Sequence, residues 1–199
     1  MEFFEYGQTE IDHLKSRDKK LAAAIDRFGT IKREVTPDLF TALVKSVVAQ
    51  QISTKAAETV WGRLCAQLSA ITPDNIAAVE VSEIQKCGLS MRKAGYIKGL
   101  GDASLCGKLD LLKLGALPDA EIIKKLLSLN GLGVWTAEMI LIFSLCRPDV
   151  VSRGDLAIRR GMMNLYGLKN LTEKQFDRYR KRYSPYGSVA SLYLWAISV

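Results

Sequence analysis

The chain has 199 residues, of which 48% are hydrophobic and 25% charged, and its formal net charge is +7 at neutral pH. This composition excludes a chain that is disordered throughout, because it provides enough apolar surface to offset the entropy of folding. The longest apolar run, residues 139–146, excludes a membrane span, since a bilayer requires roughly 20 apolar residues. The first residues carry acids where a secretory signal has a basic segment. We therefore expect an intracellular protein, located in the cytoplasm or nucleoid of a prokaryote or in the nucleus of a eukaryote.

Apolar residues recur at helical spacing along almost the whole chain. The pattern predicts helices at residues 11–28, 39–51, 54–68, 72–78, 80–86, 91–100, 118–129, 134–146, 156–166, 172–181 and 188–198. Ser53 and Thr54 are candidate N-caps of the third of these helices. No run of strict apolar–polar alternation is long enough to indicate a sheet. The predicted fold class is all-α, an irregular array of short helices joined by turns that contain glycine or proline.

The residue types that most often bind metals are few in this chain. The four cysteines, Cys65, Cys87, Cys106 and Cys146, include no CxxC pair. We interpret them as reduced, buried thiols rather than as a disulfide framework or a metal cage. The one histidine, His13, lies among charged residues, so histidine-based metal or triad chemistry has little to build on.

Positive charge is concentrated in the segment 152–182. This segment holds nine basic residues and three acidic ones, which accounts for +6 of the net charge of +7. A local excess of this kind attracts a polyanion, and nucleic acid is the usual one. The alternative is ordinary solvated surface charge.

A tight turn between two predicted helices is the first candidate binding feature. Residues 130–133 read Asn-Gly-Leu-Gly and separate an amphipathic helix from a second, apolar one. Gly131 and Gly133 leave backbone N–H groups uncovered at the start of the second helix. Such a terminus binds phosphate through its unpaired donors and the helix dipole, whatever the base sequence. The alternative is a plain helical hairpin of the core.

Four segments together resemble a known family. LNGLGVWTAEMIL is followed by PDVVSRGDLAIRRG, and VVAQQISTKAAETVWGRL and SPYGSVASLYLWAIS flank the pair. This combination resembles the helix–hairpin–helix (HhH-GPD) superfamily of base-excision DNA glycosylases over residues 9–199, and within it the alkylated-base branch, the DNA-3-methyladenine glycosylase II family. The resemblance implies a single glycosylase unit of two helical lobes. One lobe spans about 36–148, with the hairpin at 120–146, and the other combines 1–35 with 149–199. The lesion pocket is expected in the cleft between them.

Asp155 matches the catalytic aspartate of that family. Hydrolysis of an N-glycosidic bond builds positive charge on the sugar, and a fixed carboxylate stabilises it and orients the attacking water. Residues 154–156, Gly-Asp-Leu, also precede an apolar helical stretch, so Asp155 is a good N-cap as well. The two roles do not exclude each other.

Trp135 separates two mechanistic classes. In bifunctional members of the superfamily a lysine follows the hairpin at this position and attacks the sugar, whereas this chain has a tryptophan, as the alkylated-base branch does. The resemblance thus implies a hydrolase without lyase activity. An electron-rich indole also suits the positive charge of an alkylated purine. The alternative is a core aromatic residue.

The resemblance assigns the remaining DNA contacts. Gln51 is the wedge that fills the gap left by an extruded base, and Gly131, Gly133 and Thr136 bind the DNA backbone. Backbone carbonyls of Leu127, Leu129 and Leu132 would coordinate a structural Na⁺ or K⁺. No other cofactor is required, and an iron–sulfur cluster is excluded because no cysteine follows Cys146.

The predicted function is that of a monofunctional DNA glycosylase that removes alkylated purines such as 3-methyladenine and 7-methylguanine from duplex DNA. We expect a monomer whose partner is double-stranded DNA with damaged bases, with no membrane association. Two alternatives stay open. One is a non-catalytic DNA-binding module, in which Asp155 is only a cap, and the other is a glycosylase for oxidised or mismatched bases.

Overall fold

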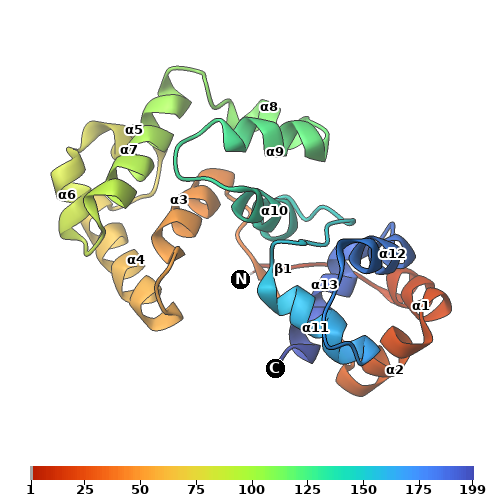
Figure 1. Cartoon of the computed structure of the whole chain (residues 1–199). Coiled ribbons are helices and arrows are strands. Elements are labelled where there is room, and N and C mark those ends of the chain that lie inside the picture. Colours follow the sequence, from red (N-terminus) through yellow and green to blue (C-terminus); the bar gives the residue numbers. More distant parts are fainter. Residues whose placement is uncertain (1) are drawn as a thin grey trace. The chain divides into compact units, whose positions relative to one another are not determined.

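The computed structural model describes residues 2–199, which form two compact units. The first unit combines the chain up to residue 35 with residues 141–199, and the second spans residues 36–140. Within the described residues the only strands are β1 (Glu2–Phe3) and β2 (Glu34–Val35), which pair antiparallel in the first unit. All other regular structure is helical (Figure 1).

The second unit is built around its long central helix. Its helices are α3 (Leu39–Ala49), α4 (Thr54–Leu68), α5 (Pro73–Ala78), α6 (Val81–Lys86), α7 (Met91–Leu105), α8 (Leu111–Ala116), α9 (Asp119–Leu127) and the first part of α10 (Val134–Phe143). Helix α7 packs against α3, α5 and α6. Leu43, Leu64, Ile76 and Ile97 are fully buried in this core. Each buried side chain of this size contributes about 1.5–3 kcal/mol to stability.

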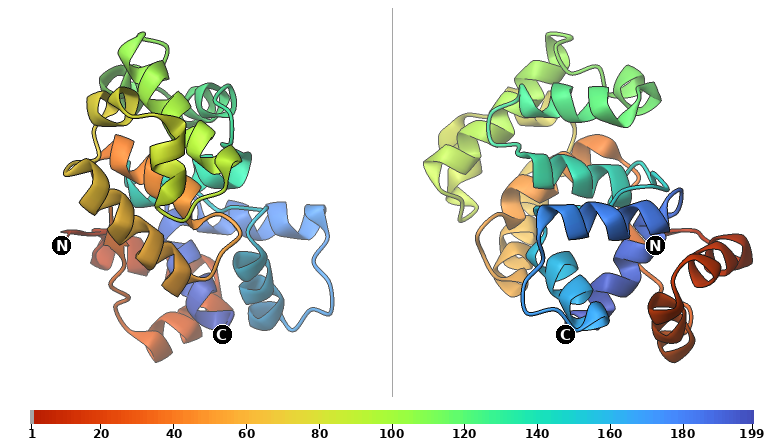
Figure 2. Two further views of the ribbon diagram at one scale, coloured as in Figure 1. Left: turned by 90° about the vertical axis from the view of Figure 1, so that its left-hand side faces the viewer. Right: turned by 45° about the vertical axis from the view of Figure 1, so that its right-hand side comes forward.

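The first unit joins helices from both ends of the chain. It contains α1 (Gln8–Arg17), α2 (Lys19–Phe28), α11 (Leu156–Tyr166), α12 (Glu173–Tyr183) and α13 (Gly187–Ile197). Helices α11 and α13 lie side by side, as the blue ribbons of Figure 2 show. They approach closely at Gly161, where an added Cβ would lie only 2.0 Å from the carbonyl oxygen of Leu194. Any larger residue there would push α11 away from α13.

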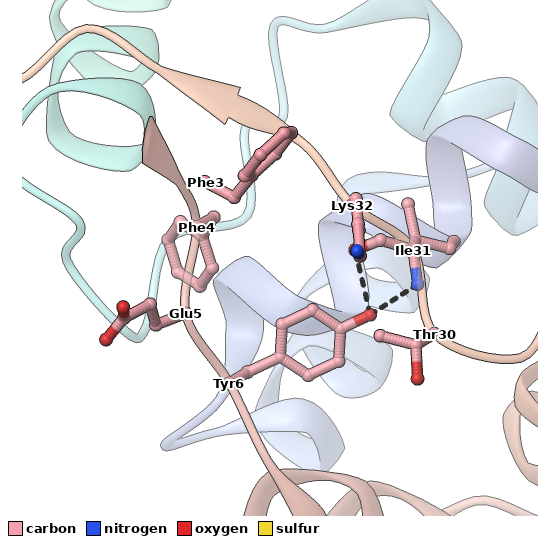
Figure 3. A pocket seen from close by; sticks show the side chains of 7 residues that line it. All are labelled: Phe3, Phe4, Glu5, Tyr6, Thr30, Ile31 and Lys32. Carbon is pink, nitrogen blue, oxygen red and sulfur yellow. Dashed lines mark hydrogen bonds between the residues drawn. The ribbon is translucent and has the colours of Figure 1, made fainter. Parts of the chain in front are cut away.

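Tyr6 holds the N-terminal segment against the residues that precede β2. Its hydroxyl accepts a hydrogen bond from the Ile31 amide (2.7 Å) and donates one to the Ile31 carbonyl (3.0 Å). These bonds lie in a pocket of about 530 Å³ that is lined by residues 3–6 and 30–32 (Figure 3). The segment is therefore held in place before the first helix begins.

Asp18 explains the main error in the predicted helices. The apolar pattern predicted one helix over 11–28, but the structure has α1 and α2, separated at Asp18. The Asp18 carboxylate accepts hydrogen bonds from the amides of Lys20 and Leu21 and so caps a new helix. Apolar spacing continues across the break, which is why the periodicity did not reveal it. Helix α8 was not predicted, while the predicted cap Ser53 does accept a bond from the Ala56 amide.

The four cysteines are free thiols, but they are not uniformly buried as expected. Cys87 is buried and Cys65 is half-buried, whereas Cys106 and Cys146 are exposed. Burial, the largest influence, raises the pKa of the Cys87 thiol. Over residues 2–199, no helix combines the length and the apolar character needed to cross a bilayer.

Candidate active site

Asp155 is a buried N-cap that is held from several directions. It precedes α11, and its Oδ1 accepts hydrogen bonds from the amides of Ala157 and Ile158, both at 2.9 Å. The indole N–H of Trp195, on α13, donates to the same oxygen at 3.2 Å. The residue is only 8% exposed. The capping role proposed for Asp155 is thus real, and the same contacts hold the carboxylate in one orientation, as charge stabilisation at a reacting sugar requires.

An aromatic wall lies beside Asp155 within the first unit. The ring of Trp195 packs on that of Phe143, with centroids 5.3 Å apart and planes inclined by 32°. The Arg33 guanidinium lies over the ring of Phe143, with its Cζ 5.3 Å from the ring centroid. Sequence reasoning did not single out Trp195 or Phe143. Their only signal is an aromatic residue in an apolar helix, which a core residue gives equally well.

The loop that leads to Asp155 is fixed by the beginning of α13. Ser188 Oγ accepts from the Val150 amide (3.0 Å) and donates to the Arg147 carbonyl (2.5 Å). Ser191 Oγ donates to the Val150 carbonyl (2.9 Å). The Asp149 carboxylate accepts from Ser184 Oγ at 2.6 Å and from the Gly187 amide at 3.1 Å. The small polar residues of the C-terminal segment therefore satisfy the hydrogen-bonding groups of the loop that leads to Asp155.

The hairpin forms at the predicted place, with α9 before it and α10 after it. Gly131 has φ +86°, which only glycine adopts without strain, and an added Cβ would lie 2.2 Å from the Tyr96 ring of α7. Gly133 has no neighbour within 4 Å of such a Cβ. The missing side chain at Gly131 thus serves packing against α7, whereas the surface beside Gly133 is open.

The other predicted contacts around the hairpin differ in exposure. Trp135 is 46% exposed in the first turn of α10, whereas Thr136 is 4% exposed, so its hydroxyl lies inside the protein. Of the residues whose carbonyls were assigned to a cation, Leu129 and Leu132 are buried and Leu127 is 43% exposed. The Leu129 carbonyl accepts the Leu132 amide at 3.4 Å. A carbonyl oxygen has two lone pairs, so the Leu129 oxygen can accept this hydrogen bond and still act as a ligand to a hard cation.

The predicted wedge lies in the turn between α3 and α4. Gln51 is exposed and has φ +56°, a left-handed conformation that non-glycine residues rarely adopt. Its neighbour Gln50 is half-buried, and its Nε2 donates to the Gly131 carbonyl at 2.8 Å. The two glutamines therefore differ in kind, because one side chain points into a contact with the hairpin and the other is accessible.

Part of the basic segment is committed to internal contacts. Arg182 forms an ion pair with buried Asp18 (2.8 Å), and Arg153 pairs with Glu173. The guanidinium groups of Arg178 and Arg182 both lie over the ring of Tyr179. The net charge available to a polyanion is thus carried by fewer side chains than the sequence count indicates.

The helical hairpin, the capping aspartate and the predominantly helical units together fit a protein of the base-excision repair class. The sequence matches the HhH-GPD superfamily of base excision DNA repair proteins over residues 44–185. The chain belongs to this superfamily, and the predicted family and fold class are thereby confirmed.

Relatives match over nearly the whole chain. DNA-3-methyladenine glycosylase 1 of Schizosaccharomyces pombe is 29% identical over 194 residues, which cover 94% of this chain and 85% of the relative. A crystal structure of a DNA-3-methyladenine glycosidase from Bacillus halodurans is 33% identical, with a TM-score of 0.89, and covers 100% of this chain and 93% of its own. A structure of the S. pombe 3-methyladenine DNA glycosylase in complex with abasic DNA is 28% identical. Its TM-score is 0.83, and the match covers 94% of this chain and 95% of that one.

Proposed function

We propose that this protein is a DNA glycosylase that hydrolyses the N-glycosidic bond of alkylated purines in duplex DNA and leaves an abasic site. The observation that carries this proposal is the buried Asp155 carboxylate, held by two helix amides and the Trp195 indole. The named activities of the relatives support the same reaction and the alkylated-base branch.

The chemistry follows from what this carboxylate does to a departing base. As the bond between the sugar carbon and the base nitrogen breaks, its electron pair leaves with the base and the sugar becomes cationic. Asp155 stabilises that cation and orients the water that adds to the sugar carbon, and the added water then loses a proton to solvent. An alkylated purine already carries a positive charge, so it leaves as a neutral base and needs no strong general acid. Trp135, in place of a nucleophilic lysine, fits a hydrolytic step without strand cleavage.

DNA binding is proposed to use the hairpin and the α3–α4 turn. Backbone N–H groups at the start of α10 bind a phosphodiester, with Gly131, Gly133 and Thr136 in that segment, while Gln51 fills the gap in the stack. The carbonyls of Leu127, Leu129 and Leu132 would hold a Na⁺ or K⁺ that neutralises charge at the DNA backbone. We further propose that the protein acts as a monomer.

The first experiment measures free bases released from methylated duplex DNA by the purified protein and by Asp155→Asn. Asparagine keeps an oxygen at the capping position, so we expect the helical circular dichroism and duplex affinity to persist. Base release falls by about 100-fold or more, because the negative charge at the reacting sugar is lost. Release of 3-methyladenine or 7-methylguanine by the parent protein supports the alkylpurine activity.

Asp38→Asn is the matched control. Asp38 caps α3 in the second unit through the Thr41 amide at 2.7 Å, so this variant makes the same chemical change in a different N-cap. We expect it to release bases at the parent rate. Full activity of Asp155→Asn would remove Asp155 from the reaction. Duplex binding without release of any base would favour the non-catalytic module, and release of only oxidised or mismatched bases would favour the other glycosylase class.

A further inference from the structure

Helix α7 supports the turn that carries Gln51. Lys93, in the first turn of α7, donates from Nζ to the carbonyl oxygens of Val48 (2.9 Å) and Gln50 (2.5 Å). These carbonyls belong to the C-terminal end of α3, where the helix dipole favours a positive charge. The ammonium group therefore fixes the backbone on one side of Gln51, and the Ser53 cap of α4 fixes it on the other.

The hairpin turn rests on the same helix. The Tyr96 ring, one helical turn after Lys93, fills the space where Gly131 has no side chain. The Gly131 carbonyl is in turn held by the Gln50 side chain at 2.8 Å. Gln50 therefore links the two turns, since it begins the α3–α4 turn, where its carbonyl binds Lys93, and its side-chain amide binds the hairpin.

This arrangement explains how Gln51 keeps an unfavourable conformation. The left-handed conformation is unfavourable for a residue other than glycine and persists only where neighbouring contacts enforce it. The enforcing contacts here are the bonds of Lys93 and Gln50, because they hold the residue directly before Gln51. Burial lowers the pKa of the Lys93 ammonium, and Arg92 lowers it further.

We propose that Lys93 and Gln50 are positioning residues that hold the α3–α4 turn, which carries Gln51, at a fixed distance from the hairpin. The inference rests on the proposed function, in which the hairpin grips the DNA backbone and Gln51 enters the base stack. If Gln51 is already held in place relative to the phosphate-binding hairpin, no conformational entropy is lost to order it when DNA binds. Loss of the hydrogen bonds of Lys93 or Gln50 therefore makes extrusion of a paired base harder and leaves the reaction at Asp155 unchanged.

The test compares Gln50→Met and Lys93→Met on two duplexes. Methionine matches the length of the glutamine side chain, is one atom shorter than lysine, and removes the donor group of both. One duplex carries 7-methylguanine opposite cytosine, and the other carries it opposite an abasic-site analogue, where no partner base holds it. We expect single-turnover release of the base from the paired duplex to fall about tenfold, which is the size of effect that the loss of such a hydrogen bond produces. Release from the unpaired duplex should fall less than about threefold. Lys93→Arg, which keeps a cationic donor, should recover most of the loss.

Lys98→Met is the matched control on the same helix. Lys98 donates to the Ala77 carbonyl and so caps α5, which adjoins neither the α3–α4 turn nor the hairpin. Its removal deletes one charge and one helix cap, and any effect should be equal on the two duplexes. Equal losses on both duplexes in Gln50→Met and Lys93→Met, at unchanged circular dichroism, would reduce these residues to structural ones, and parent rates on both would overturn the inference.

A second readout separates this inference from the proposed reaction. Fluorescence of 2-aminopurine beside an abasic-site analogue reports unstacking when the protein binds, with no bond broken. We expect both variants to give a smaller increase than the parent at saturating protein. If the parent releases no base from either duplex, the proposed function fails while this comparison still decides the inference. If the parent gives no increase, the inference fails as well.

Discussion

At the scale of single residues, one oxygen atom joins the fold to the proposed chemistry. Oδ1 of Asp155 accepts two amide hydrogen bonds from the first turn of α11 and a third from the Trp195 indole. The amide bonds would form at any capping aspartate. The indole bond is different, because it comes from a separate helix and sets the direction of the carboxylate.

Trp195→Phe tests that bond and keeps most of the ring that packs on Phe143. Hydrogen bonds to charged groups contribute about 1.5–3 kcal/mol, so we expect base release to fall about tenfold or more in kcat, with little change in KM. Steady-state kinetics on methylated duplex DNA measures this. Trp61→Phe, an equivalent change on α4, should keep the parent rate. An unchanged kcat in Trp195→Phe would limit the indole to packing.

At the scale of elements, the hairpin shows that two glycines in one turn do different work. A Cβ at Gly131 meets Tyr96 and a positive φ, whereas a Cβ at Gly133 meets open space. We expect Gly131→Ala to lower the free energy of unfolding by about 2 kcal/mol or more, through backbone strain and overpacking. Gly133→Ala should change it by less than about 0.5 kcal/mol. Urea unfolding of both variants checks the difference.

Measuring the affinity of the same variants for duplex DNA then separates an effect on DNA binding from an effect on stability. If the backbone beside Gly133 approaches a phosphate, Gly133→Ala weakens binding to normal and lesion DNA alike while the fold stays intact. Tyr96→Ala combined with Gly131→Ala should recover part of the lost stability, because it removes the steric conflict but not the strained φ. A Gly131→Ala protein as stable as the parent would show that α7 yields easily, and the packing argument would fail.

At the scale of the whole molecule, Asp18 ties together helices from opposite ends of the chain. Its carboxylate caps α2 and accepts hydrogen bonds from Tyr166 Oη (2.6 Å) on α11 and Arg182 (2.8 Å) on α12. Burial, the largest single influence, raises the pKa of Asp18, but the bonds from Tyr166, Arg182 and the Leu21 amide together outweigh it. The net result is a lowered pKa. Burial raises the pKa of Tyr166, which therefore remains a donor.

A lowered pKa in the folded state sets the sign of the acid response. The unfolded chain binds a proton on Asp18 at a higher pH, near the usual value of about 3.9, than the folded protein does. The stabilisation is therefore complete above that pH and is lost as the pH falls through the folded pKa. We expect Tm to drop between about pH 5 and pH 2, and to drop less steeply in Asp18→Asn, which is also less stable at neutral pH. Tyr166→Phe should lie between the two, and identical pH profiles would contradict the assignment.

What the sequence determined by itself is local or carried by motif. Helical periodicity predicts most of the helices, because each depends on residues three and four apart. The motif around the hairpin and Asp155 identifies the superfamily, and the Gly-Asp-Leu pattern correctly indicates a cap. Periodicity failed at Asp18, since the apolar spacing continues across the break that its carboxylate creates.

Only the tertiary structure decided which distant residues meet within each unit. Trp195 bonds to a carboxylate 40 residues away, and Gln50 bonds to a carbonyl 81 residues away. The sequence predicted a phosphate contact in the segment of Gly131, and only the fold shows that the Tyr96 ring also packs against this glycine. Nothing in the local pattern encodes these pairs, because the contact depends on how whole helices pack and not on spacing along one of them. The residues that hold Asp155 and the hairpin in place are for that reason ones that a sequence pattern does not reveal.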